Sequence, residues 1–284
     1  MIAFIASASL FIARQRMLAR AAAVSIGGTK STSSTEGGSV REKSSSQILS
    51  PPAPDKGADP EKGCEDCSLK KSLADTVKAY DRHVIICGYE AGFPASHIEK
   101  GNDFIAKLQA QLKPSKMAFK ITGCMHKNSH ADRTDVIVYP EKLMVTINTA
   151  MDAEITALAS WLVDPNKTRL SLPSSPLPWD YLILVCVHGA RDARCGSTGT
   201  ELMHALESQV KRQESISSSP PRSVYICGSS HVGGHEFAGN AIIYPAGHWY
   251  GYLDKSHAEE LLNAVLSGHK MEACFRGRAS KYSW

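Results

Sequence analysis

The sequence predicts an α/β protein built from two tandem thioredoxin-like domains. An internal repeat, the order of strands and helices within each copy, and the chain length carry this prediction. The chain has 284 residues, whereas a single domain usually has about 100–200. Its hydrophobic fraction of 43% and charged fraction of 21% are typical of a soluble protein that buries a core. The net charge of +4, with no block of Lys or Arg, does not favour nucleic acid as a partner.

The repeat aligns two stretches of equal length without a gap. Residues 121–140, ITGCMHKNSHADRTDVIVYP, align with residues 226–245, ICGSSHVGGHEFAGNAIIYP. Upstream, RHVIICG aligns with YLILVCV and places Cys87 on Cys186. Such self-similarity indicates a duplicated structural unit. The identical aligned pairs are Ile121 and Ile226, Gly123 and Gly228, His126 and His231, His130 and His235, Ile137 and Ile242, Tyr139 and Tyr244, and Pro140 and Pro245.

Each copy predicts the order strand, helix, strand, strand, strand and helix. The predicted strands are short and rich in Val, Ile and Tyr, and the predicted helices have apolar residues at helical spacing. A β-α-β unit followed by a β-β-α unit is the layout of a thioredoxin-like domain. We expect the N-terminal domain over residues 63–165 and the C-terminal domain over residues 175–280, joined around PNKTRLSLPSSPLPWD. After RHVIIC and YLILVC, which form the first strands, helices are expected over 104–112, 153–162, 201–210 and 258–266, and strands over 117–122, 136–140, 143–147, 223–227, 241–245 and 248–253.

The N-terminal residues are predicted to be a targeting sequence followed by a linker. Residues 1–30 contain Arg14, Arg16, Arg20 and Lys30 but no acidic residue, which is typical of a mitochondrial transit peptide. An untargeted tail is the alternative. The apolar run at residues 1–13 is shorter than the roughly 20 residues that span a bilayer, so no membrane span is expected. Residues 31–62 are rich in Gly, Ser, Thr and Pro, and this composition predicts a disordered linker.

Cys64 and Cys67 form a C-x-x-C pair in the sequence GCEDC. In thioredoxins such a pair opens a helix after a strand, and the helix terminus lowers the thiol pKa. Here the pair follows a Pro/Gly-rich stretch, and two acidic residues between the thiols disfavour a thiolate. Two ordinary cysteines are therefore the simpler interpretation, with a redox or accessory metal role as the alternative.

The chemistry-bearing residues concentrate after the first two strands of the second copy. Cys186 and Cys195 lie on the segment that leaves one strand, and His231 and His235 lie on a Gly-rich loop that leaves the next. Neighbouring strands of a sheet bring their following loops together, so the sequence predicts that these four side chains form a metal site. In the first copy Ser96 occupies the position that corresponds to Cys195, so that half is predicted to be a degenerate site.

Two thiols and two imidazoles fit either zinc or an iron–sulfur cluster. Zinc-site thiols usually stand two to four residues apart, whereas Cys186 and Cys195 enclose a longer loop, which favours a [2Fe–2S] cluster. Arg191, Arg194 and His188 lie in or beside this loop, where positive charge would stabilise a reduced cluster. No carboxylate pair, Ser/His/Asp set or phosphate loop is apparent, so an electron carrier is favoured over a stand-alone enzyme.

These motifs are similar to those of the sucrase/ferredoxin-like family, the thioredoxin-like ferredoxins of the actin-patch-distribution and altered-inheritance-of-mitochondria type. The resemblance runs from YDRHV at residues 80–84 through CVHGARDARCG, SSHVGGHEFAGNAIIYP, GHWYGYL and FRGR. It implies that the C-terminal domain is a thioredoxin-like ferredoxin that carries a [2Fe–2S] cluster for electron transfer in redox homeostasis. The implied ligands are Cys186, Cys195, His231 and His235. The expected partners are the iron–sulfur assembly machinery and a redox partner protein, whose identity the resemblance does not supply.

The sequence is also compatible with two rival functions and with two locations. A zinc-stabilised interaction module would use the same four residues, and a thiol oxidoreductase would use Cys64 and Cys67. The N-terminus predicts the mitochondrion. The terminal Trp284 resembles the tail by which cytosolic iron–sulfur proteins are recognised by their assembly machinery, so the cytosol is the alternative.

Overall fold

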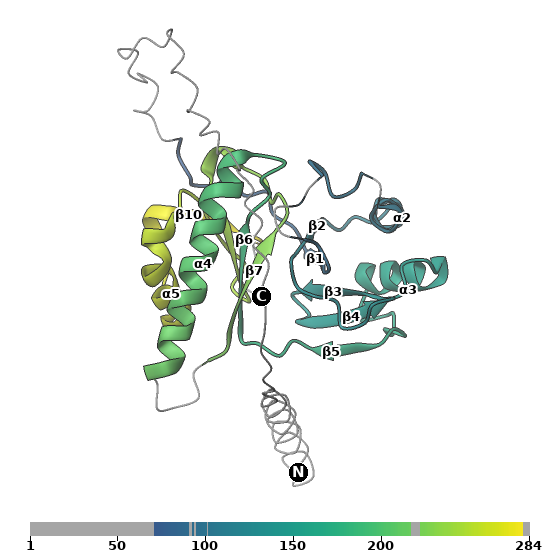
Figure 1. Ribbon diagram of the computed structural model, residues 1–284. Coiled ribbons are helices and arrows are strands. Elements are labelled where there is room, and N and C mark those ends of the chain that lie inside the picture. Colours follow the sequence, from purple (N-terminus) through teal and green to yellow (C-terminus); the bar gives the residue numbers. More distant parts are fainter. Residues whose placement is uncertain (1–70, 91–92, 94, 101, 217–221, 281–284) are drawn as a thin grey trace, which may run out of the picture. The chain divides into compact units, whose positions relative to one another are not determined.

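Figure 1 shows the computed structural model, which describes residues 71–90, 93, 95–100, 102–216 and 222–280. Within these residues the fold is mixed α/β with two five-stranded sheets. The predicted transit peptide and linker, the pair Cys64 and Cys67, and Trp284 lie outside the described residues. No described helix combines the length and the apolar character needed to cross a membrane.

The first sheet has the strand order β2-β1-β3-β4-β5. Strand β1 is parallel to β2 and antiparallel to β3, and the sheet continues antiparallel through β4 and β5. The helices of this half, α2 and α3, are in contact with each other (Figure 1). The bounds are β1 Arg82–Ile86, α2 Asp103–Leu112, β2 Phe119–Gly123, β3 Thr134–Tyr139, β4 Leu143–Ile147, α3 Asp152–Val163 and β5 Ser174–Pro176.

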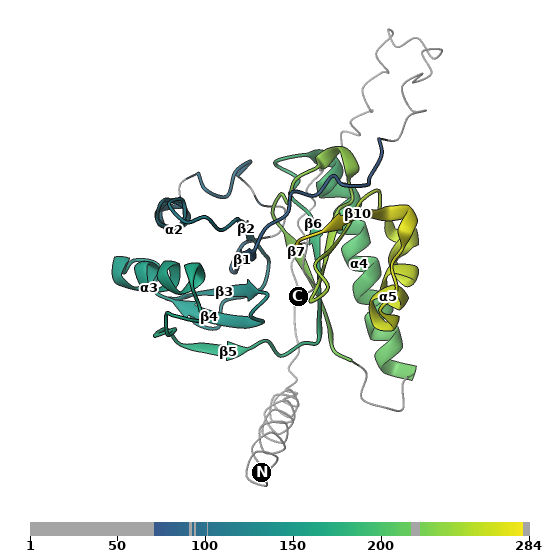
Figure 2. The same ribbon diagram turned by 180° about the vertical axis from the view of Figure 1, so that it is seen from behind.

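The second sheet repeats this arrangement in the order β7-β6-β8-β9-β10. Strand β6 is parallel to β7 and antiparallel to β8, and β9 and β10 follow antiparallel. Helices α4 and α5 pack side by side, as both views show (Figures 1 and 2). The two sheets therefore have equivalent strand orders and directions. The bounds are β6 Tyr181–Cys186, α4 Ala193–Ile216, β7 Val224–Ser229, β8 Ala241–Tyr244, β9 His248–Tyr250, α5 Ala258–Ser267 and β10 Phe275–Arg278, with short 3-10 turns η1 His235–Phe237, η2 Lys255–His257 and η3 Glu272–Cys274.

Alternate residues of the central strands face different cores. In β1, Val84 packs with the apolar residues of α2 and α3, whereas Ile85 packs in a cluster shared with the second sheet. In β6, Ile183 packs with α4 and α5, whereas Leu184 joins the shared cluster. Both faces of each sheet are therefore covered, which explains why these strands are apolar throughout rather than alternating with polar residues.

The edges of the two sheets meet where β2 and β7 end. The N–H of Met125 donates to the carbonyl of Gly228 at 2.9 Å, and the N–H of Ser230 donates to the carbonyl of Gly123 at 2.9 Å. An isolated antiparallel bridge joins Cys124 to Ser229. Backbone pairing as well as side-chain packing thus connects the two halves.

Helix α4 starts earlier than the sequence predicts. It begins at Ala193 rather than near residue 201, so Cys195 lies in its first turn and not on a loop. The carboxylate of Asp192 accepts a hydrogen bond from the N–H of Arg194 at 3.0 Å and satisfies one of the free donors of the helix start. The sequence does not predict this first part of the helix because the glycines of CGSTG have low helix propensity.

The described chain also contains strands that were not predicted. Ser174–Pro176, within the expected interdomain linker, forms β5 and pairs with β4. Phe275–Arg278 forms β10 and pairs with β9. Strand β5 is exposed along its length, so its sequence has no apolar pattern, and its Pro is tolerated because β5 is an edge strand.

Candidate metal centre

The close approach of α4 to the end of β6 brings Cys186 and Cys195 together. A Cβ atom at Gly199 would lie 2.0 Å from the carbonyl oxygen of Cys186, and one at Gly196 would lie 2.6 Å from the Cα atom of Gly189. Only glycine at these positions lets the helix pack this tightly on the strand end. Both cysteines are fully buried, and the side chain of Cys195 lies near enough to that of Cys186 to change its pKa.

The surroundings of Cys186 favour its thiolate. The hydrogen bond from Cys195 lowers the pKa of Cys186 well below its usual value, although burial opposes the shift. His231 and the backbone N–H groups of His188 and Val232 lower it further. The same contact raises the pKa of Cys195, because a second negative charge beside Cys186 is disfavoured. Hydrogen-bond donors directed at a ligand sulfur are the kind of support that metal–thiolate sites use.

The histidine loop depends on two glycines with left-handed backbone angles. Gly233 has a φ of +102° and Gly234 a φ of +72°, values that other residues rarely adopt. The loop brings the rings of His231 and His235 to a centroid distance of 5.7 Å. Within the described protein, Nδ1 of His231 is buried and has no hydrogen-bond partner. His235 is exposed.

His188 positions this loop and carries no positive charge. Its Nδ1 accepts the backbone N–H of His231 at 2.9 Å, so its Nε2 carries the proton and donates to the carbonyl of Ala95 at 2.7 Å. The side chain is 1% exposed, and burial lowers its pKa. The sequence-based expectation of a cation at His188 is therefore wrong. The residue instead connects the histidine loop to the first half through two hydrogen bonds.

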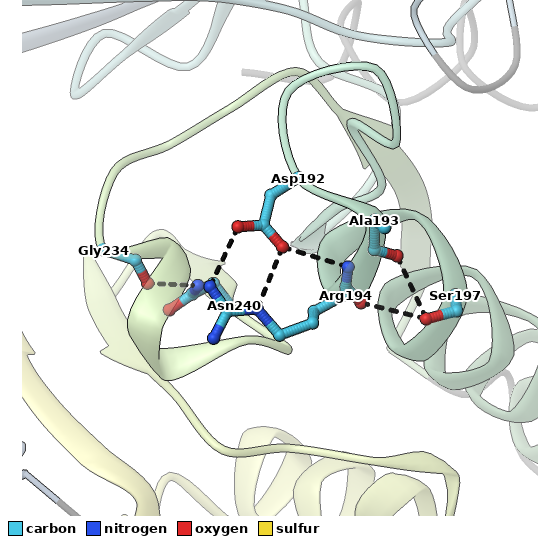
Figure 3. A network of polar contacts seen from close by, with 6 residues as sticks. All are labelled: Asp192, Ala193, Arg194, Ser197, Gly234 and Asn240. Carbon is cyan, nitrogen blue, oxygen red and sulfur yellow. Dashed lines mark hydrogen bonds and ion pairs between the residues drawn. The ribbon is translucent and has the colours of Figure 1, made fainter. Parts of the chain in front are cut away.

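The charge of Arg194 is also compensated. Figure 3 shows its guanidinium facing the carboxylate of Asp192, with hydrogen bonds of 3.1 and 2.9 Å. These contacts lower the pKa of Asp192 to about 2, so the carboxylate is ionised at neutral pH. Figure 3 also shows the side-chain amide of Asn240, which donates to the carbonyl of Gly234 at 2.8 Å and supports the histidine loop. Arg191 contacts Nε2 of His97 at 2.7 Å.

The corresponding residues of the first half do not assemble. Cys87 contacts Cys124, with 3.7 Å between the sulfur atoms. Nδ1 of His126 is hydrogen-bonded to the hydroxyl of Tyr225 in the second half at 2.7 Å. His130 is exposed. The first-half residues that match the candidate ligands are thus used in packing or face solvent.

The structure gathers the candidate ligands without placing three of them around one point. Cys195 and His231 both lower the pKa of Cys186, and the ring of His235 lies 5.7 Å from that of His231. Across the described residues, no three His, Cys, Asp or Glu side chains are placed to hold a single metal ion. The donor types, the unpaired Nδ1 of His231 and the N–H groups at the Cys186 sulfur fit a soft metal group.

Comparison with known proteins gives related sequences and structures. A family profile described as sucrase/ferredoxin-like matches residues 73–277. Altered inheritance of mitochondria protein 32 from Candida glabrata is 31% identical over 139 residues, which cover 44% of this chain and 42% of that protein. The protein of the same name from Meyerozyma guilliermondii is 43% identical over 90 residues, covering 31% of this chain and 30% of that protein. This chain therefore spans less than half the length of these curated relatives.

Among solved structures, the wild-type thioredoxin-like [2Fe-2S] ferredoxin from Aquifex aeolicus is 15% identical with a TM-score of 0.30. The matched region covers 34% of this chain and 97% of that ferredoxin.

Proposed function

Since this chain belongs to the sucrase/ferredoxin-like family, we propose that it is an electron-transfer protein of two tandem thioredoxin-like domains. The C-terminal domain is the ferredoxin, and it holds a [2Fe–2S] cluster on Cys186, Cys195, His231 and His235. The cluster supplies one-electron transfer, and the chain supplies ligation, orientation and electrostatics.

The gathering of two thiols and two imidazoles after β6 and β7 is the observation that supports the proposal. A two-iron cluster distributes its protein ligands over two metal atoms, whereas a single zinc ion needs four donors at one point. The donors are spread from Cys195 and Cys186 through His231 to His235, and among the described residues no three of them surround one point, which supports the first arrangement.

Several residues of this chain then have defined tasks. The N–H groups of His188 and Val232 stabilise negative charge on the Cys186 sulfur. The side chain of His188 holds the backbone of His231 in place. His235 is exposed, so a redox partner protein would approach the cluster from the histidine side.

The test is the metal content and colour of protein purified without oxygen. We expect red-brown protein with about two irons and two sulfides per chain, bleached by dithionite. Cys195→Ala should lose the iron. His231→Cys should keep iron but shift the visible spectrum, because a thiolate replaces an imidazole. The aligned first-half variant His126→Cys is the matched control and should leave the spectrum unchanged.

Each rival function predicts another outcome. Colourless protein with about one zinc that also fails reconstitution with iron and sulfide would establish the zinc-stabilised interaction module. Thiol oxidoreductase activity that is lost in Cys64→Ser or Cys67→Ser but kept in Cys186→Ser would establish that the protein is a thiol oxidoreductase.

For location and partners we propose the mitochondrion, a redox partner protein there, and the iron–sulfur assembly machinery. The names of the curated relatives and the basic, acid-free residues 1–30 support this location. Deleting residues 1–30 should move the protein out of mitochondria. Full-length protein found in the cytosol, with cluster content that depends on Trp284, would contradict this location.

A further inference from the structure

A cavity of about 350 Å³ borders the histidine loop and is lined by residues from both halves of the molecule. Lys120 of β2 comes from the first half, and Trp249 of β9 and Arg276 of β10 come from the second. The segment before β1 closes one side with Thr76 and Lys78; this segment, dark blue in Figure 2, runs beside β10. The remaining lining residues are Val77, Val232, Gly233, Gly234, Glu236 and Phe237.

The cavity contains two cations with neutral hydrogen-bond partners. Arg276 is 2% exposed and donates to the carbonyls of Gly233 and Thr76, the side-chain oxygen of Asn240 at 2.6 Å and the hydroxyl of Thr76. Lys120 is partly buried and donates to the carbonyl of Val232 at 2.5 Å. In the described part of the chain, neither forms an ion pair with a carboxylate.

This arrangement is unfavourable for the protein alone. Burying a cation without a counterion is costly, and two neighbouring cations repel each other. Burial and the field of Arg276 lower the pKa of Lys120 to about 8, against a smaller opposing effect of Cys186, and burial lowers the pKa of Arg276 to about 10. Glu236 lies at the cavity but is exposed, and its field only partly offsets the effect of burial on Arg276. A bound anion would remove the imbalance.

The walls of the cavity indicate an organic anion. Lys120 Nζ lies 4.9 Å from the ring centre of Trp249, and Arg276 Cζ lies 5.4 Å from Trp249 and 4.6 Å from Phe237. The aromatic faces therefore lie against the two cationic groups. Trp249 and Phe237 are 3% and 4% exposed, so the apolar body of a ligand would meet only the small part of each ring that lines the cavity. The volume is within the range of small-molecule sites.

We propose that Lys120, Arg276 and Trp249 form a binding site for a small organic anion with a carboxylate or phosphate group. The anionic group binds between the lysine and the guanidinium, and the organic part packs on the aromatic rings. The proposal uses none of the four candidate ligands of the metal centre.

The test is isothermal titration calorimetry on anaerobically purified full-length protein at constant ionic strength. The probes are inorganic phosphate, phenyl phosphate and succinate, with chloride as the reference. Phenyl phosphate should bind more tightly than inorganic phosphate, because only it contacts the aromatic walls. Equal affinities of these two probes, or no saturable heat above chloride for any probe, would overturn the proposal.

Two variants reduce the positive charge available to the anion, one by removing the Lys120 ammonium group and one by pairing Arg276 with a new carboxylate. Lys120→Met should weaken phenyl phosphate binding roughly tenfold to hundredfold, because one charge-assisted hydrogen bond is lost. Asn240→Asp places a carboxylate at the position that already contacts Arg276, so it should weaken binding comparably even if Lys120→Met fails to fold. Lys116→Met, an exposed lysine on the same half, is the matched control and should bind as the parent does. Unchanged affinity in both site variants would overturn the proposal.

Discussion

The two halves have the same strand order but close the loop after their second strand in different ways. In the first half side chains close it: the N–H of Asp135 donates to the side chain of Asn128, and the Asp135 carboxylate accepts the N–H of Ser129. In the second half Gly233 and Gly234 take the positions of Asn128 and Ser129, and their left-handed angles turn the chain. The second loop is therefore held mainly by backbone conformation.

This difference decides what the histidines of each loop do. Closed by Asn128 and Asp135, the first loop directs His126 to Tyr225 across the contact between the halves. Turned by glycines, the second loop brings His231 next to His235 and towards Cys186. A duplicated backbone thus keeps its sheet while a few loop side chains determine whether donor atoms gather.

The largest predicted difference concerns the aligned cysteines Cys186 and Cys87. On the proposed function, Cys186→Ala should reduce the iron content from about two per chain to near zero. Cys87→Ala should leave it unchanged, because Cys87 contacts only Cys124 among the candidate donors of its half. Iron analysis after anaerobic purification measures both. Equal iron loss in the two variants would mean that the halves share one site.

The next prediction concerns Gly199, which lies against the end of β6 in the second half. Gly199→Ala puts a methyl group against the carbonyl oxygen of Cys186, so we expect the free energy of unfolding to fall by about 3 kcal/mol. Urea denaturation followed by circular dichroism measures it. Ser197→Ala, on the exposed side of the same turn, should change stability by less than about 0.5 kcal/mol. A tolerated Gly199→Ala would show that α4 can move away from β6.

A smaller difference is expected between His188 and the aligned Tyr89. His188→Leu leaves the N–H of His231 and the carbonyl of Ala95 without their partner, which should lower the free energy of unfolding by about 2 kcal/mol. Tyr89→Phe removes only the hydrogen bond from Asn102 and should cost about 1 kcal/mol or less. Urea midpoints compare the two variants. Equal losses would contradict the positioning role of His188.

The smallest predicted effect is a pH-dependent contribution of Asp135, in the first loop, to the free energy of unfolding. Burial alone would raise the pKa of Asp135, but hydrogen bonds from Ser129 and Thr146 outweigh it and hold the pKa below its usual value. The ionised carboxylate therefore adds stability above the unfolded pKa of about 3.9, and this contribution disappears as pH falls through the folded value.

The corresponding measurement compares urea midpoints at pH 6 and pH 3. Asp135→Asn should be less stable than the parent at pH 6, and the difference should shrink at pH 3. The exposed Asp132→Asn is the charge-matched control. A stability difference that is the same at both pH values would show that the carboxylate charge of Asp135 is not what matters.

The parts of the fold that the sequence predicts are those that repeat or are buried on both faces. Segments such as RHVIIC and YLILVC have no polar alternation because helices cover one face and the other sheet covers the second. The repeat then predicts the same strand order twice. Strand β5 escapes prediction because its pairing uses only backbone groups and its side chains are exposed.

The sequence predicts candidate residues for the site but not the contacts of their neighbours. Spacing after the strands selects Cys186, Cys195, His231 and His235 as candidates. It does not reveal that His188 contacts Ala95 or that Arg194 is paired with Asp192, since those roles depend on hydrogen-bond geometry. The cations Lys120 and Arg276 lie far apart in the sequence and meet only in the folded chain.

Strands β2 and β7 are each at the edge of their own sheet, and they face each other across the bridge between Cys124 and Ser229. An exposed sheet edge recruits strands from other molecules and promotes aggregation. Here the end of each edge is occupied by its counterpart within the same chain. Either half expressed alone would leave these backbone groups and the cluster shared by the two sheets without their partners, so we expect it to aggregate more readily than the full chain.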